Sequence, residues 1–168
     1  ERDCELVPYG MDDISPTEET VIIVEGEIDK LSYHAAGITN VLSVPNGAPP
    51  ANAKNAERHL NWLNATGMEA LHSRVQKWIL DVDNDDPGRA LEQLLSRRLN
   101  REKVFVTRKP DGCKDANDVL VKHGPEALRE MVQKARPLPV QGLWEANDPM
   151  IADALEREWE DDSPEAGY

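Results

Sequence analysis

The sequence contains few cysteines and no long apolar run, and each absence excludes a class of protein. The two cysteines, Cys4 and Cys113, form no metal-type pair, so we expect no disulfide, no zinc cluster and a reducing, cytoplasmic setting. No stretch resembles a signal peptide, and no apolar run approaches the length of a membrane span. The 168 residues are enough for one domain, with or without tails, and a sizeable core.

Two common phosphate-binding motifs are also missing. The chain has no Gly-x-x-x-x-Gly-Lys-Ser/Thr loop, and no Gly-x-Gly-x-x-Gly follows a predicted strand. We therefore do not expect the chain to bind ATP as a P-loop protein does, and a dinucleotide-binding fold is disfavoured.

Positive charge is scarce in total, but the excess of acid lies at the two ends. The formal net charge is −13, of which residues 1–20 carry −6 and residues 145–168 carry −8, leaving +1 for residues 21–144. The total argues against a nucleic-acid partner, whereas the middle of the chain is compatible with one.

These differences predict three segments. Residues 1–19 form an acidic lead-in, residues 20–144 a folded domain, and residues 145–168 an acidic tail. Apolar residues at helical spacing favour an amphipathic helix in the tail, namely Ile151, Leu155 and Trp159.

Strands alternate with helices through the middle segment. Apolar, β-branched runs predict four strands at Thr20–Val24, Val41–Val44, Lys77–Val82 and Val104–Val106. Helical spacing of apolar residues predicts helices after Glu25 and at residues 51–63, 68–72, 87–99, 116–121 and 125–135. This alternation is typical of an α/β fold with about four mainly parallel strands flanked by helices.

Acidic residues follow three of the predicted strands. Glu25 follows the first strand, Asp83 and Asp85 follow the third, and Asp115 lies in the loop beyond the fourth. Ligands of an open parallel sheet gather outside the carboxyl ends of its strands, so adjacency of these strands would bring the carboxylates together. A set of oxygen ligands with open positions suits Mg²⁺, and its chemistry is phosphoryl or nucleotidyl transfer.

These acidic residues have two other possible interpretations. Each acid taken alone is typical of a turn or a helix cap, and Asp86 followed by Pro87 predicts the start of a helix. An EF-hand calcium loop beginning at Asp81 is disfavoured, because its sixth position should be glycine and is Asp86, and because a strand-like segment precedes it.

Four short motifs follow one another along the chain: Glu25-Gly-Glu-Ile-Asp29, Val44-Pro-Asn-Gly-Ala48, Asp83-Asn-Asp-Asp-Pro-Gly-Arg89 and Lys114-Asp-Ala-Asn-Asp118. Together they resemble the Toprim domain, the Rossmann-like catalytic fold shared by DnaG-type primases, topoisomerases and some nucleases. The closer resemblance, from about Thr20 to Trp144, is to phage-type primase–helicases and the related Twinkle proteins. It implies a DNA primase domain that makes RNA primers on single-stranded DNA during replication, using Mg²⁺ or Mn²⁺ in its place.

The resemblance also implies roles for individual residues. Glu25 would be the general acid/base or a metal-site carboxylate, Asp83 and Asp85 would bind the metal, and Asp115 would complete its site. Asp81 lies one strand step before the motif and is expected to support it. Candidates for nucleotide or phosphate contacts are Lys30, Asn46, Gly47, Arg89 and Lys114, although solvated cations and a plain tight turn are equally typical readings of these residues.

The implied partners are a single-stranded DNA template and nucleoside triphosphates, in a bacterial cell or phage-infected host. Family primases also carry an RNA-polymerase subdomain, often a zinc-binding domain, and a helicase domain, none of which is recognisable here. We therefore expect the chain alone to prime poorly or not at all. A Toprim nuclease or strand-cleavage module, and a non-catalytic Toprim scaffold that binds partners or DNA, remain as alternatives.

Overall fold

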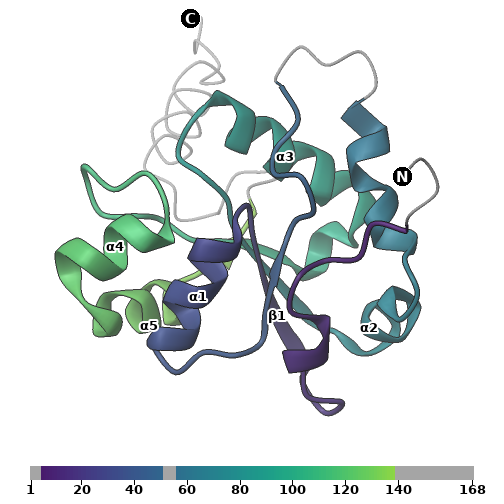
Figure 1. Cartoon of the computed structure of the whole chain (residues 1–168), viewed down its shortest axis with the longest axis horizontal. Helices are drawn as coiled ribbons and strands as arrows, with labels where there is room; N and C mark the ends of the chain where they lie inside the picture. Colours follow the sequence, from purple (N-terminus) through teal and green to yellow (C-terminus); the bar gives the residue numbers. More distant parts are fainter. Residues whose placement is uncertain (1–4, 51–55, 139–168) are drawn as a thin grey trace, which may run out of the picture. The chain divides into compact units, whose positions relative to one another are not determined.

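A five-stranded sheet runs through the centre of the computed structural model, which describes residues 5–50 and 56–138 (Figure 1). The sheet order is β2-β1-β3-β4-β5, in which the first four strands are parallel and β5 is antiparallel to β4. The strands are β1 (Thr20–Val24), β2 (Val41–Ser43), β3 (Lys77–Asp81), β4 (Val104–Val106) and β5 (Arg136–Pro137). The expected mainly parallel α/β sheet is confirmed, while β5 was not predicted because a two-residue strand with a proline has no periodic signal.

Helices cover both faces of the sheet. On one side lie α1 (Glu27–Ala35), α4 (Ala116–His123) and α5 (Pro125–Gln133), and on the other lie α2 (Met68–Arg74) and α3 (Asp86–Arg98) (Figure 1). Three short 3-10 helices complete the described elements: η1 (Met11–Asp13), η2 (Ala56–Asn64) and η3 (Arg101–Lys103). Within the described ranges, no helix has both the length and the apolar character that crossing a membrane requires.

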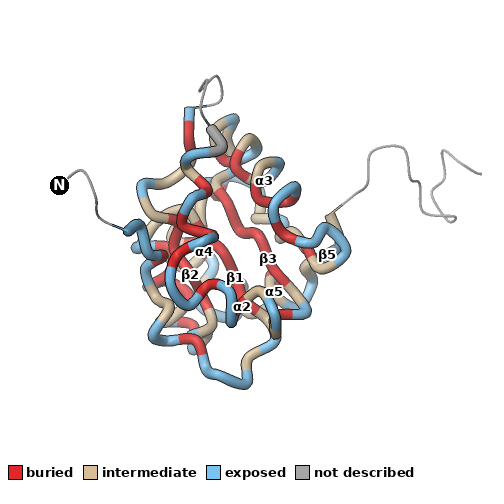
Figure 2. The backbone as a smooth tube through the Cα atoms, turned by 90° about the vertical axis from the view of Figure 1, so that its right-hand side faces the viewer, coloured by how far each residue is buried: buried red, intermediate tan, exposed pale blue. Residues whose placement is uncertain are grey.

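The central strands are buried on both faces, which explains their uninterrupted apolar sequence. Successive side chains of a strand point to opposite faces, so Val21 and Ile23 enter the core beneath α2 and α3. Ile22 and Val24 enter the core beneath α1, α4 and α5. All four side chains have 0% exposure, and β1 and β3 appear as buried segments in Figure 2.

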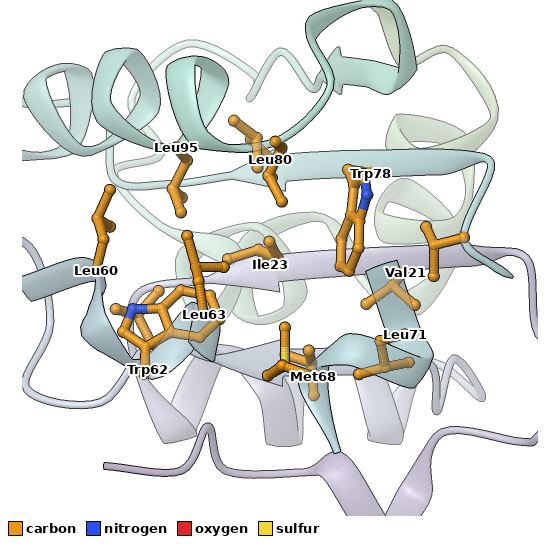
Figure 3. Close-up of a cluster of buried hydrophobic side chains, with 14 of the residues drawn as sticks. Val21, Ile23, Leu60, Trp62, Leu63, Met68, Leu71, Trp78, Leu80 and Leu95 are labelled. Atoms are coloured by element: carbon orange, nitrogen blue, oxygen red, sulfur yellow. The ribbon is translucent and has the colours of Figure 1, made fainter. Parts of the chain in front are cut away.

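The larger core contains most of the bulky side chains. Trp62 from η2 and Trp78 from β3 are 1% and 2% exposed, and they line the same cluster as Leu95 of α3 (Figure 3). Burying a leucine side chain such as that of Leu95 stabilises the fold by roughly 1.5–3 kcal/mol. The helix predicted from residue 51 is a 3-10 helix from Ala56 in the part that the structure describes.

Residues 5–19, predicted as an acidic lead-in, contact the domain. Tyr9 forms an isolated antiparallel bridge with Ser43 of β2. Ile14 is 7% exposed and belongs to the larger core. The amphipathic helix predicted in the acidic tail at 145–168 lies outside the described residues.

The packing of α3 against the sheet makes Leu95 a test of this core. We expect Leu95→Ala to lower the free energy of unfolding by about 2–5 kcal/mol, because it leaves a cavity beneath a fully buried helix face. Val121→Ala is the matched control, since Val121 is 74% exposed on α4 and should change stability by less than about 0.5 kcal/mol. Urea unfolding measures both, and equal losses in the two variants would contradict the assignment of this core.

Candidate active site at the carboxyl edge of the sheet

Glu25 and Asp83 meet where β1 and β3 end. Val24 and Asp81 are register partners in the parallel pair, so the residues that follow them leave the sheet side by side. The backbone N–H of Asp83 donates to Oε1 of Glu25 at 2.9 Å. The N–H of Ala48, in the turn after β2, donates to the same carboxylate. Three neighbouring strand ends therefore converge on Glu25.

Burial and charge both act on this carboxylate. Partial burial raises the pKa of Glu25, and the nearby charges of Asp83 and Asp85 raise it further, while the two backbone N–H donors oppose the shift. A raised pKa favours the protonated form of a carboxyl group, which is the form that can donate a proton.

Asp85 ends the turn and begins α3. Its backbone is extended, and its carboxylate accepts a hydrogen bond from the N–H of Gly88 at 2.9 Å. The predicted cap was wrong by one residue: Asp85 caps the helix, while the side chain of Asp86 is exposed and pairs with Arg89. The Gly88 donor, assisted by Lys114, holds the pKa of Asp85 below its ordinary value.

Gly88 allows the first turn of α3 to approach the site. A Cβ atom at this position would lie 2.1 Å from the carbonyl oxygen of Asp83 and 2.7 Å from Oε1 of Glu25. Both distances are far below van der Waals contact, so any side chain here would displace the acidic residues. The glycine of the Asp-x-Asp-x-x-Gly motif is thus a requirement of close packing.

Lys114 joins the third-strand acids to the loop after β4. Its Nζ lies 2.9 Å from Oδ2 of Asp83 and 3.2 Å from Oδ2 of Asp85. The N–H of Asn84 donates to the carbonyl oxygen of Lys114 at 2.9 Å, which holds the two loops together. These interactions with the two carboxylates raise the pKa of Lys114, so it is cationic at neutral pH.

Asp115 and Asp29 lie at the start of α4. Asp115 caps this helix by accepting the N–H of Asp118 at 2.7 Å. Asp29 of α1 accepts the N–H of Asn117 at 3.1 Å and is only 8% exposed. Burial, followed by the charges of neighbouring acids including Asp115, raises the pKa of Asp29 to about 6. Asp29 belongs to the same sequence motif as Glu25, but its position in the sequence did not predict a role for it.

A buried polar network lies directly beneath the site. The Asp81 carboxylate accepts hydrogen bonds from Tyr33 at 2.7 Å, from Thr107, and from Lys109 at 2.7 Å. Lys109 also donates to the carbonyl oxygen of Val82 at 2.6 Å, next to the Asp83 turn. Removing one partner of such a buried ion pair typically costs about 3–5 kcal/mol. Asp81 is thus held beneath the site by Lys109, a residue that none of the four motifs contains.

The structure places the predicted phosphate-binding residues in different surroundings. Lys30 is 1% exposed, and its Nζ bonds to Asp13 at 2.6 Å and to His34 at 2.8 Å, so it does not reach the carboxylates at the sheet edge. Arg89 is exposed on the first turn of α3 and pairs with Asp86.

Asn46 and Gly47 lie in a turn that reaches the site. Their φ angles are +66° and +65°, a left-handed pair that asparagine and glycine tolerate best. The next residue, Ala48, donates its N–H to Glu25. Asn46 and Gly47 therefore form a tight turn, as the alternative interpretation expects, and this turn also lies next to the site.

The same edge was predicted to hold a metal ion. Among residues 5–50 and 56–138, no three acidic, His or Cys side chains are arranged to hold one. Each predicted ligand has another partner: Glu25 accepts N–H donors, Asp115 caps α4, and Asp83 and Asp85 share the Lys114 ammonium. The last pair nevertheless fits a hard cation, because two carboxylate oxygens converge on one positive point and Mg²⁺ commonly uses one or two carboxylates plus water and phosphate.

The fold and this edge together define an α/β protein with a carboxylate cluster at the carboxyl ends of parallel strands. A family described as Toprim-like matches residues 22–120, and the chain belongs to this family. The resemblance to Toprim domains of primase-type proteins is confirmed.

Three similar proteins extend the comparison. The chain is 38% identical over 161 residues to the Twinkle homolog protein, chloroplastic/mitochondrial, of Arabidopsis thaliana, covering 88% of this chain and 22% of that protein. It is 38% identical over 154 residues to the Primase homolog protein of Arabidopsis thaliana, covering 84% and 44% respectively. The chain therefore spans less than half the length of these curated relatives.

The third is a chain in the structure of the bacteriophage T7 lagging-strand DNA polymerase interacting with primase domains bound to an RNA/DNA hybrid and dTTP. Its TM-score is 0.55 with 29% sequence identity, and the match covers 71% of this chain and 56% of that one.

The close approach at Gly88 leads to a first prediction for the site. We expect Gly88→Ala to lower the free energy of unfolding by about 1–3 kcal/mol, because the added methyl group must push α3 away from Asp83 and Glu25. Gln93→Ala, at an exposed position of the same helix, is the control and should be nearly neutral. Thermal unfolding measures the difference, and a fully stable Gly88→Ala variant would contradict the packing described above.

The buried Asp29 predicts a dependence of stability on pH. Its pKa rises from 3.8 to about 6 in the folded chain, so the folded state binds more protons than the unfolded state between these values and stability falls as the pH rises through them. We expect Asp29→Asn to exceed the wild type in stability by up to about 3 kcal/mol at pH 7, with little difference at pH 4.

Urea unfolding at the two pH values, in EDTA, measures this effect. Asp111→Asn, at an exposed position, is the control and should give the same difference from wild type at both values. An Asp29→Asn variant that is equally destabilised at pH 4 and pH 7 would show that the carboxylate is needed only as a hydrogen-bond acceptor.

Proposed function

We propose that this chain is the Toprim catalytic part of a DNA primase of the primase–helicase type, which makes RNA primers on single-stranded DNA from nucleoside triphosphates. The observation that supports it most is the meeting of Glu25 with the Asp83–Asp85 turn, where the Glu25 carboxylate and the Asp83 N–H are 2.9 Å apart. The Toprim-like family and the primase-type relatives support the same assignment.

In this proposal Asp83 and Asp85 hold Mg²⁺, with Mn²⁺ as a substitute. The bound ion supplies neutralisation of phosphate charge and alignment of the attacking and leaving oxygens. Asp115, which follows Lys114 and caps α4, would complete the metal site. Glu25 is the group that exchanges a proton with the substrate, because its raised pKa and its position beside Asp83 suit it to general acid/base work.

Residues around the carboxylates would orient the nucleotide. Lys114 is half-exposed and already faces the edge of the sheet, and Arg89 is exposed on the first turn of α3. Both cations suit contacts with phosphate oxygens. The Asn46–Gly47 turn offers backbone that a nucleotide can approach closely. Lys30 is left out of this set because its ammonium is buried against Asp13.

The complete protein that carries this chain would include further domains. The primase-type relatives are longer than this chain, and the RNA-polymerase subdomain, zinc-binding domain and helicase domain of the family are proposed as its linked partners. A template strand needs a binding surface larger than the edge of one sheet, so the chain alone should show little or no primer synthesis.

Primer synthesis by the complete protein tests the proposal. We expect Glu25→Gln and Asp83→Asn each to lower template-dependent incorporation of labelled ribonucleotides by roughly 100-fold or more, as loss of a proton-transferring or metal-holding group does. Glu130→Gln, on the exposed face of α5, should leave the rate unchanged.

Other results would replace the proposal with an alternative. Full activity of Glu25→Gln would indicate a non-catalytic scaffold. Nicking of supercoiled plasmid in the presence of Mg²⁺, without primer synthesis by the complete protein, would indicate a nuclease.

A further inference from the structure

Lys114 occupies the position between Asp83 and Asp85. Its ammonium contacts one oxygen of each carboxylate, at 2.9 Å and 3.2 Å. Two carboxylates that point to the same place repel each other, and a shared cation removes that repulsion. In the part of the chain that the structure describes, the other nearby cations have different partners: Arg89 pairs with Asp86, and Lys109 is buried on Asp81.

The backbone around Lys114 is held while its side chain can move. The Lys114 N–H donates to the Asp118 carboxylate at 3.0 Å, and its carbonyl oxygen accepts the N–H of Asn84 at 2.9 Å. The side chain is 55% exposed, so its four-carbon stem can swing into solvent without disturbing the core.

The two acidic residues are less free than the lysine. The Asp85 carboxylate is fixed by the hydrogen bond from Gly88, while the backbone of Asp83 is fixed on Glu25 and its side chain is only 16% exposed. Any exchange of cations at this pair would therefore move the lysine and leave the acids in place.

We propose that Lys114 is the internal counter-ion of the Asp83–Asp85 pair, that a divalent cation must displace it to bind there, and that the displaced ammonium then serves a substrate phosphate. This inference rests on the proposed function, because it deepens the role of the same metal-holding pair. The carboxylate oxygens that face the ammonium are the ones that a hard cation would use, so both cations cannot hold them at once. The exchange links the arrival of the metal to the release of a phosphate-binding group.

Equilibrium binding of Mn²⁺ to the chain tests this exchange. Free Mn²⁺ is measured by its electron paramagnetic resonance signal for the wild type, Lys114→Met and the control Lys122→Met. Methionine keeps an unbranched apolar stem and removes the charge. Lys122 lies on α4 beside the same motif but pairs with Asp118, so its loss changes nearby charge without freeing the Asp83–Asp85 pair.

We expect Lys114→Met to bind Mn²⁺ about fivefold more tightly than the wild type, the change expected when an exposed competing ion pair is removed. Lys122→Met should stay within about twofold of the wild type. Equal or weaker binding by Lys114→Met would overturn the inference and would mean that the lysine organises the carboxylates for the metal. The proposed function would survive that result.

A second measurement follows the lysine itself. Nitrogen-15 resonances of the lysine ammonium groups are recorded with and without saturating Mg²⁺. The Lys114 signal should move and broaden as its ion pairs are lost, while the Lys122 signal stays in place. An unmoved Lys114 signal at saturation overturns the inference alone, whereas absence of any metal binding by folded wild-type and Lys114→Met chains overturns the proposed metal site as well.

Discussion

The parallel pairing of β1 with β3 is the constraint on which the rest of the site depends. The register that sets Val24 beside Asp81 also delivers Glu25 and the Asp83 turn to neighbouring points of one sheet edge. A slip of one residue would reverse which side chains of β1 face each core, and both cores are closely packed. The free energy that fixes the register therefore comes from apolar burial and is far larger than the contribution of any single contact at the site. The register in turn sets the positions of the acidic residues at the edge.

Concentrated negative charge is stabilised because each acid has a partner, and Asp83 and Asp85 share one in Lys114. Glu25 accepts hydrogen bonds from backbone N–H groups, and Asp85 accepts one from the N–H of Gly88 in the first turn of α3. Asp81 is paired with Lys109 in the core. Helix N-termini and cations offset the repulsion that these carboxylates would otherwise exert. The acidic edge is thus organised before any ligand arrives, as the proposed function requires of a site that positions charged phosphates.

A helix cap and a candidate site residue turn out to be compatible roles. Asp85 and Asp115 each accept a backbone N–H of the helix that they begin, as the plain structural interpretation of these acids expects. Asp85 also presents a second oxygen to Lys114. A carboxylate has two oxygens and several lone pairs, so one can hold the helix while another faces the edge of the sheet. Composition at a strand end therefore cannot decide between the two interpretations.

The strands and the layer arrangement follow from local sequence, because a β-branched run such as Thr20–Val24 is buried on both faces wherever it pairs. The four motifs were likewise sufficient to select Glu25, Asp83 and Asp85 as a group. Partners distant in sequence could not be foreseen: Asp29 meets a backbone group 88 positions away, and Lys109 meets Asp81 28 positions away. Lys30 shows the same limit, since only the fold directs its ammonium to Asp13. Sequence alone determined the four parallel strands and which acids follow them, through periodicity and residue type, but not the short β5. Tertiary structure decided which cation neutralises which acid, because ion pairs depend on distances that only packing sets.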